Sequence, residues 1–545
     1  MTMQQPAPPS AEESELYYYG LPSCPRLVAR SSTHIWQNPQ MPGFTTFTGT
    51  LNMYPKSLRP AGRHPLLHQL WNNATSSLRV QIVEAVSAAS DWTAIDILRV
   101  GLNKEFYPTL LLAVKPDSLS WSRGHAIALR CKAILEDHGI HDVHCEIRES
   151  VVTLCTGGPS TTDSATEDST PNDFQLSSMP ITTPNAAIRA DLSDCLGTKI
   201  AMKDMDGRAG TKGLYLALSP SSPSGGEPRI VVLTCRHVVI DPKTEGLQTY
   251  SRQASEPLKE VIQVDQPAFE EMLERLECAT TQHRNAADRL SEQGKTDSAA
   301  IYSHLADSSK ALLEAIKPYE ASSSRVFGQL LYAPEFNSTS SGHGATWLRD
   351  WALIELLPGR HQAQHSALKN KVFVEALETF LFLVENNRKG WKGLPEPLEP
   401  IVENCTVELQ QVVVPMGEIF SPVHFAEYVD EPAILVAKYG ARGGLTLGLG
   451  NTLKSVVRHT ETLDGDRESM SEEWAITSVS RATDRQAAFS KKGDSGSCIW
   501  DMAQRVAGIV MAGGGINGVN DVTYAQPVER LLADIRAHGF NVSLV

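Results

Sequence analysis

Cysteine is scarce in this chain of 545 residues: only nine occur, widely scattered and with no Cys-x-x-Cys pair. An odd, dispersed set does not form a disulfide framework, so we expect a protein of a reducing compartment. Long hydrophobic runs are also lacking, since runs such as Thr109–Val114 fall far short of the ~20 residues of a membrane helix. The polar, proline-rich N-terminus lacks the basic start and apolar core of a signal peptide. We therefore expect an intracellular, cytoplasmic protein with no membrane partner.

Positive charge is in the minority. Lysine and arginine total 49 against 63 aspartates and glutamates, which gives a formal net charge of −14. Because nucleic-acid binding depends largely on cationic side chains, this balance argues against a nucleic-acid partner. The sequence has no Gly-x-x-x-x-Gly-Lys-[Ser/Thr] phosphate loop, and its N-terminal part has no cluster with metal-ligand spacing. We expect neither a cofactor nor a metal.

Composition divides the chain into four parts. Residues 1–16 are polar and acidic and are predicted to form a flexible tail. Residues 17–155 alternate short apolar runs with a helical pattern over residues 121–138, and indicate a small α/β domain. Residues 156–185 are rich in Ser, Thr, Asp, Gly and Pro, and such a stretch buries too little apolar area to fold. These residues are predicted to be a disordered linker.

The fourth part, residues 186–545, contains many short apolar runs separated by Gly, Pro or polar turns. That rhythm predicts a mainly β fold, either a sandwich or a pair of barrels. At about residues 265–318, two segments with helical spacing are joined by a short Gly-containing turn, which predicts an antiparallel helical hairpin. We favour packing within one chain over an oligomeric coiled coil for this hairpin. A further helix is predicted over residues 365–387.

Three short motifs carry the chemistry. His237 follows a β-forming run, Asp350 opens an apolar strand, and Ser495 lies in a Gly-Asp-Ser-Gly turn. A serine hydroxyl becomes a nucleophile when a neutral imidazole takes its proton, and a carboxylate orients that imidazole. Each motif alone has an ordinary structural explanation, such as a buried core histidine. The three together, in this order, predict His237, Asp350 and Ser495 as catalytic residues.

In these motifs the chain resembles the chymotrypsin-like (trypsin-like) serine proteases of the PA clan, over about residues 187–545. The resemblance implies a double β-barrel with the helical hairpin as an insertion. It also implies an oxyanion hole made by the N–H groups of Gly493 and Ser495, which the flanking glycines allow to turn inward. The specificity pocket would have Phe489 at its base and the residues Met511, Ala512 and Gly513 in its wall. Because no carboxylate lies at that base, a medium-sized uncharged residue is expected before the scissile bond.

Within that clan, the segment Lys438-Tyr-Gly-Ala-Arg-Gly-Gly-Leu-Thr-Leu-Gly resembles fungal intracellular proteases. That group includes the self-processing protease of yeast amino-acid sensing, which has an N-terminal prodomain. The resemblance implies that residues 17–155 are a prodomain, and self-cleavage is expected within residues 156–185, after Leu176; the alternative is a flexible linker that stays uncut. Two features depart from the digestive relatives: Val238 replaces a bridging cysteine, and no Ile-Val-Gly-Gly-like start is present to pair with Asp494. Activation by the digestive zymogen route is therefore not expected.

The leading hypothesis is an intracellular serine endopeptidase whose partner is a protein or peptide substrate. The alternative is an inactive protease-like scaffold that binds regulatory proteins through the N-terminal domain or the helical hairpin. A fluorophosphonate probe separates the two, because it labels only an activated serine.

Overall fold

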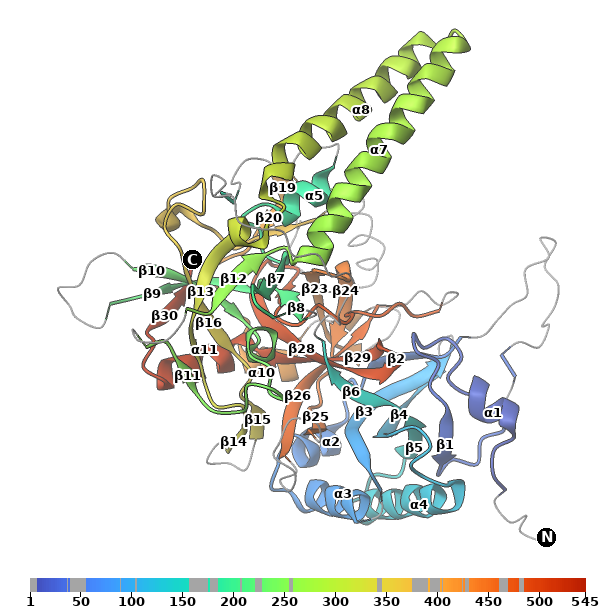
Figure 1. Cartoon of the computed structure of the whole chain (residues 1–545). Helices are drawn as coiled ribbons and strands as arrows, with labels where there is room; N and C mark the ends of the chain where they lie inside the picture. The colour runs from blue at the N-terminus through green and yellow to red at the C-terminus, as the bar shows by residue number, and fades with distance from the viewer. Residues whose placement is uncertain are drawn as a thin grey trace.

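The computed structural model is mainly β (Figure 1). It describes residues 7–36, 38–39, 55–88, 90–102, 105–155, 175–176, 185–205, 208–220, 228–253, 258–340, 346–374, 391–392, 402–403, 405–423, 425–426, 431–459, 469–479 and 485–545. The predicted linker over residues 156–185 lies outside the described residues except for Gln175, Leu176 and Asn185.

In the N-terminal part, five strands pair in the order β1-β5-β4-β3-β2, with helices packed against them. Its core contains Trp71, Trp92 and Ile147, which are fully buried. The helix predicted over residues 121–138 is confirmed as α4. It ends just before Gly139, whose φ of 78° suits glycine. The elements are β1 (Leu27–Arg30), β2 (Ser57–Pro60), α2 (Pro65–Trp71), α3 (Ser77–Ser87), β3 (Trp92–Leu102), β4 (Glu105–Val114), α4 (Trp121–Asp137), β5 (His144–Glu149) and β6 (Val151–Leu154).

The tail predicted over residues 1–16 is partly wrong, because α1 (Ala11–Leu16) is a helix. Ser10 caps it by accepting a hydrogen bond from the Glu13 N–H at 3.0 Å. Ser14 Oγ then donates to the Leu27 carbonyl at 2.6 Å, which attaches the helix to β1. These local contacts order a stretch whose composition alone favours disorder.

In the C-terminal part, six strands pair in a closed ring, in the order β26-β24-β23-β27-β28-β29 and back to β26. Helix α11 contacts two of these strands, β28 and β29, and in addition β30. The elements here are α10 (Met416–Phe420), β23 (Ile434–Gly440), β24 (Gly444–Gly450), β25 (Ser455–His459), β26 (Ser469–Ser478), β27 (Cys498–Asp501), β28 (Val506–Ile516), β29 (Val519–Pro527), α11 (Val528–Ala537) and β30 (Val542–Leu544).

A second, nine-stranded sheet has the order β30-β9-β10-β16-β13-β12-β7-β8, with β11 paired to β13. Its elements are α5 (Ala186–Asp191), β7 (Lys199–Met202), β8 (Ala209–Thr211), β9 (Leu214–Leu218), β10 (Arg229–Thr234), α6 (Arg236–Val239), β11 (Tyr250–Ser251), β12 (Glu260–Gln263), β13 (Val326–Ala333) and β16 (Ala352–Leu356). Smaller pairings involve β14 (Ser338–Ser340), β15 (Thr346–Leu348), β17 (Lys371–Phe373), β18 (Trp391–Lys392), β19 (Val402–Glu403), β20 (Thr406–Glu408), β21 (Phe425–Ala426) and β22 (Glu431–Pro432).

The predicted helical hairpin is confirmed: α7 (Gln266–Glu292) and α8 (Thr296–Ile316) pack along each other and extend away from the rest of the chain (Figure 1). The helix predicted over residues 365–387 is wrong in its described part, since β17 forms there and pairs with β20. Asn370 fixes this extended path, because its side chain exchanges hydrogen bonds with the Tyr215 backbone at 2.8 and 3.1 Å. Residues 375–387 lie outside the described residues.

The N-terminal sheet continues into the C-terminal ring. β3 pairs with β25, and β6 pairs with β28, so strands of both parts belong to one 13-stranded sheet. Buried polar contacts reinforce this junction: Arg148 lies 3.1 Å from Asp521, and the Asn451 amide donates to the Ile97 carbonyl at 3.0 Å. Among the described helices, none combines the length and apolar character required to cross a membrane.

Candidate active site

Strand pairing brings His237 and Asp350 together. β10 and β16 are antiparallel neighbours, with Thr234 opposite Ala352. The residues just after β10 therefore lie beside those just before β16. His237 lies in the short helix α6 that follows β10, rather than at the end of a strand as its sequence context predicts.

The imidazole connects the carboxylate to the serine. His237 Nδ1 lies 2.5 Å from Asp350 Oδ2, and His237 Nε2 lies 2.8 Å from Ser495 Oγ. The backbone N–H of His237 also donates to Asp350 Oδ1 at 3.0 Å. Burial acts to raise the pKa of Asp350, but the contacts with His237 outweigh it and lower the pKa below its ordinary value. Asp350 is therefore a buried carboxylate suited to holding the Nδ1–H tautomer.

A tight turn presents Ser495. Gly493 has a φ of 106° and Gly496 a φ of 94°, a backbone conformation that other residues rarely adopt. A Cβ on Gly496 would lie 2.2 Å from the Thr211 carbonyl oxygen. Thr211 also holds the turn from outside, because its hydroxyl donates to the Gly493 carbonyl at 2.9 Å and its N–H donates to the Ser495 carbonyl at 2.8 Å. Both glycines are therefore required by the geometry.

Asp494 points away from the hydroxyl of Ser495 and into the protein. Its Oδ2 lies 2.8 Å from Lys438 Nζ, and neither side chain is exposed. Oδ1 accepts from the N–H groups of Arg442 and Gly443 at 3.0 and 2.8 Å. Asp494 thus has a cation inside the folded chain, where the sequence offers no new N-terminus. Lys438 begins the segment that resembles fungal proteases, and no local motif indicates its pairing with Asp494.

The N-terminal part supplies a strand to the same place. β6 pairs antiparallel with β28, with Leu154 opposite Ala512 and Thr153 opposite Gly513 (Figure 1). After β6, the Cys155 N–H donates to the Met511 carbonyl at 3.3 Å. The residues expected to form the pocket wall therefore hold an extended segment of the chain itself.

The Cys155 carbonyl oxygen accepts two hydrogen bonds from the serine turn. The Gly493 N–H donates to it at 2.6 Å and the Ser495 N–H at 3.2 Å. These are the two amides that the motif singled out as an anion site. A carbonyl oxygen held by these two amides lies where a developing oxyanion would be stabilised, so the arrangement resembles that of a peptide bound for nucleophilic attack. Nothing in the composition of residues 151–155 indicates this role.

The Cys155 side chain is surrounded by polar side chains. Its sulfur accepts a hydrogen bond from Asn520 Nδ2 at 3.4 Å, and the side chain of Ser490 also interacts with it. Phe489, the residue predicted at the base of the pocket, packs into a core cluster with Ile476 and Val510, and it is its neighbour Ser490 that interacts with the Cys155 sulfur. Asn520 lies on β29 beside the predicted wall and has no motif around it.

Leu176, the residue expected to precede a self-cleavage site, forms its backbone hydrogen bonds with residues outside the turn that carries Ser495. Its N–H donates to the Arg360 carbonyl at 2.7 Å, and its carbonyl accepts from the Gln362 N–H at 3.0 Å. The side chain is buried. The backbone of Leu176 is thus paired with residues 360 and 362, whereas the Cys155 carbonyl accepts from the amides of the serine turn. Cys155 therefore replaces Leu176 as the candidate position.

Among the residues that the structure describes, one group of side chains has metal-like spacing: the ligand atoms of Cys235, His237 and Asp350 lie within 4.8 Å of one another. Two of them are bound to each other, and the Cys235 thiol donates to the Val510 carbonyl at 3.3 Å. Burial raises the pKa of that thiol well above its usual range, with Asp350 acting in the same direction. A thiol that keeps its proton is a poor ligand, so the group suits a triad better than a metal.

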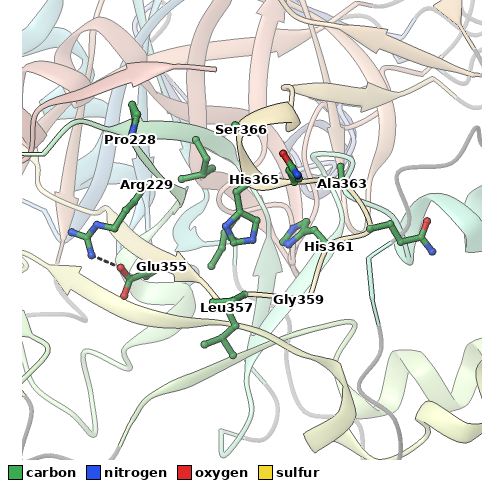
Figure 2. A pocket seen from close by; sticks show the side chains of 14 residues that line it. Pro228, Arg229, Glu355, Leu357, Gly359, His361, Ala363, His365 and Ser366 are labelled. Atoms are coloured by element: carbon green, nitrogen blue, oxygen red, sulfur yellow. Dashed lines mark hydrogen bonds and ion pairs between the residues drawn. The ribbon is translucent and has the colours of Figure 1, made fainter. Parts of the chain in front are cut away.

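A separate pocket contains His361 and His365, whose rings meet edge to face with centroids 5.3 Å apart (Figure 2). Burial lowers the pKa of His361 to about 3, and Lys212 and His365 act in the same direction. Its ring therefore stays neutral. None of the three candidate triad residues is among the side chains that line this pocket.

No family model matches the chain, and no curated protein matches it. Among solved structures, the inactive form of a serine-to-alanine mutant of Rv3671c from M. tuberculosis aligns with 67% of this chain and 97% of its own. The sequence identity is 11% and the TM-score is 0.22. A likeness at this level does not establish a shared fold or function. The chemistry of the site is therefore derived from its own geometry.

Proposed function

We propose that the protein is a serine endopeptidase with His237 as general base, Asp350 as the orienting carboxylate and Ser495 as nucleophile. The observation that carries this proposal is the Cys155 carbonyl, which accepts hydrogen bonds from both the Gly493 and the Ser495 amides. An inactive scaffold has no physical need for a triad and a carbonyl aligned in this way.

The reaction follows from the contacts. His237 Nε2 takes the hydroxyl proton while Ser495 Oγ bonds to the carbonyl carbon, and the two amides stabilise the oxyanion that forms. As the C–N bond breaks, the imidazolium gives its proton to the departing amine. Water then adds to the acyl-enzyme with His237 again as base, which releases a carboxylate and restores Ser495. Asp350 stays ionised and stabilises the charged imidazole in both halves.

The fold that we propose for this chemistry is the chymotrypsin-like double β-barrel. The closed ring of six strands would be one barrel, and the nine-stranded sheet would be the other with its insertions. His237 and Asp350 come from the barrel built on the nine-stranded sheet, whereas Ser495 comes from the six-stranded ring. A site between two barrels forms only when both have folded.

The first substrate that we propose is the chain itself, at the bond between Cys155 and Thr156. β6 already occupies the cleft as a strand paired with β28, which is how proteases bind extended peptides. A tethered segment also reaches an effective concentration in the millimolar range. No other substrate is needed for a first turnover.

The test is the mass of the wild-type chain beside Ser495→Ala, each made by cell-free synthesis and sampled over time. We expect the wild type to convert into two fragments and the variant to stay whole. A wild type that remains whole while folded, and that a fluorophosphonate does not label, would favour the scaffold. Ser193→Ala serves as the matched control, since that serine is equally buried but lies outside the triad.

A further inference from the structure

The pocket around the Cys155 side chain is small and closed by polar groups. Asn520 Nδ2 donates to the Cys155 sulfur at 3.4 Å and to Ser490 Oγ at 3.1 Å. Ser490 Oγ in turn lies 2.7 Å from Thr523 Oγ1. These three side chains are buried, so they form a fixed floor rather than a mobile surface.

Gly513 leaves room for the Asn520 side chain in this pocket. A Cβ at this position would lie 2.1 Å from Asn520 Cγ, so the Asn520 side chain fills the space beside the wall strand. A carboxamide held there by hydrogen bonds cannot move aside at low cost. The depth left for an incoming side chain is therefore about that of a cysteine.

The charges near the pocket exclude ionised side chains of either sign. Asp494, a carboxylate whose charge acts on Cys155, is already paired with Lys438, so this carboxylate is not free to pair with a buried lysine or arginine. The same carboxylate repels a second negative charge. Burial raises the pKa of the Cys155 thiol to about 12, and the charge of Asp494 acts in the same direction.

We propose that this pocket accepts only small uncharged side chains before the scissile bond, with cysteine as its natural occupant, and that Asn520 sets the size limit. The proposal rests on the proposed peptidase function and adds its substrate class. Alanine and serine should fit, because they are no larger than cysteine. Phenylalanine would overlap the Asn520 carboxamide, and arginine would add a buried unpaired charge.

The experiment compares self-cleavage rates of full-length Cys155→Ala, Cys155→Ser, Cys155→Phe and Cys155→Arg by intact mass. We expect the first two to be cut within about tenfold of the wild-type rate and the last two about 100-fold more slowly or worse. Thermal unfolding of each change in a Ser495→Ala background shows whether the chain still folds. Should one not fold, the peptides Val-Val-Thr-Leu-Xaa-Thr with the same residues are offered to the cut wild-type protein, with the same order of rates expected.

A compensating change makes the test specific. Asn520→Ala should restore at least tenfold of the lost rate in Cys155→Phe, because it opens the floor of the pocket. Asn541→Ala, on the surface, should restore nothing. Equal cutting of Cys155→Phe and wild type, or no rescue by Asn520→Ala, would overturn the proposed specificity while leaving the peptidase in place. A wild type that is never cut overturns the peptidase itself.

Discussion

Lys438 Nζ lies 2.8 Å from Asp494 Oδ2, with both side chains fully buried. Burial acts to raise the pKa of Asp494, but Lys438 outweighs it and lowers the pKa below its ordinary value. The same carboxylate accepts the Arg442 and Gly443 amides. The turn that carries Gly493 and Ser495 is thus fixed by the folded chain, before any bond is cut. We expect the oxyanion site to be formed in the intact protein.

Lys438→Met should impair both folding and self-cleavage. Removing one partner of a buried ion pair leaves an uncompensated charge, which costs about 3–5 kcal/mol of stability. The Asp494 carboxylate would then pull the turn out of position and slow the cut about 100-fold. Urea unfolding and fragment mass measure the two effects. Lys310→Met, which breaks an exposed pair with Glu314, is the control and should change neither. Wild-type cutting by a folded Lys438→Met chain would contradict this role.

His237→Ala and Asp350→Asn should each slow self-cleavage about 10⁴-fold. The first removes the base, and the second removes the charge that holds its tautomer. Fragment mass over hours to days gives the rates. Circular dichroism should show an unchanged fold for Asp350→Asn, because the amide fits the same space. Retention of more than a tenth of the wild-type rate by either variant would contradict its assigned part.

Stability should fall as pH rises because of Glu473. Burial raises its pKa to about 8, with the charge of Asp350 acting in the same direction and a hydrogen bond from Ser471 opposing it. Below the unfolded value of 4.5 both states hold the proton; between 4.5 and about 8 only the unfolded state releases it. The free energy of unfolding should therefore drop by about 1.4 kcal/mol per pH unit in that window.

Glu473→Gln removes this pH dependence. Urea unfolding at pH 5, 6.5 and 8, in a Ser495→Ala background, should show the variant gaining on its parent as pH rises. The two proteins should differ least at pH 5. Parallel stability curves would mean that Glu473 is ionised in the folded protein.

The two fragments should stay together after the cut. β3 remains paired with β25, and Arg148 remains buried against Asp521, whether or not the cut end of β6 leaves β28. Gel filtration should give one peak containing both fragments, and 6 M urea should separate them. Separate elution in native buffer would show that the shared sheet does not hold without the covalent link.

Local patterns predicted much of this molecule. The helix that ends before Gly139 and the hairpin of α7 and α8 follow from spacing that neighbouring residues alone establish. In the described part of the segment expected to be a helix over residues 365–387, a strand forms instead, because Asn370 is hydrogen-bonded to Tyr215, far away in the sequence. Helical spacing gives no warning of such a contact.

In the candidate site, too, local motifs were predictable and long-range contacts were not. Its three motifs each lie within a few residues, and the structure brings their side chains into one hydrogen-bonded chain, although their catalytic role stays a prediction. The groups that bind Asp494 and the Gly493 and Ser495 amides could not be predicted from local motifs. Lys438 and Cys155 reach the turn through strand pairings, of β23 with β27 and of β6 with β28, which no local motif records.

The most direct test is to identify the new termini in the self-cleaved wild-type protein by tandem mass spectrometry. The account predicts one fragment that ends at Cys155 and another that begins at Thr156, with neither found in Ser495→Ala. Termini elsewhere in residues 156–185, or the same cut in Ser495→Ala, would contradict the claim that Ser495 attacks the carbonyl it is aligned with.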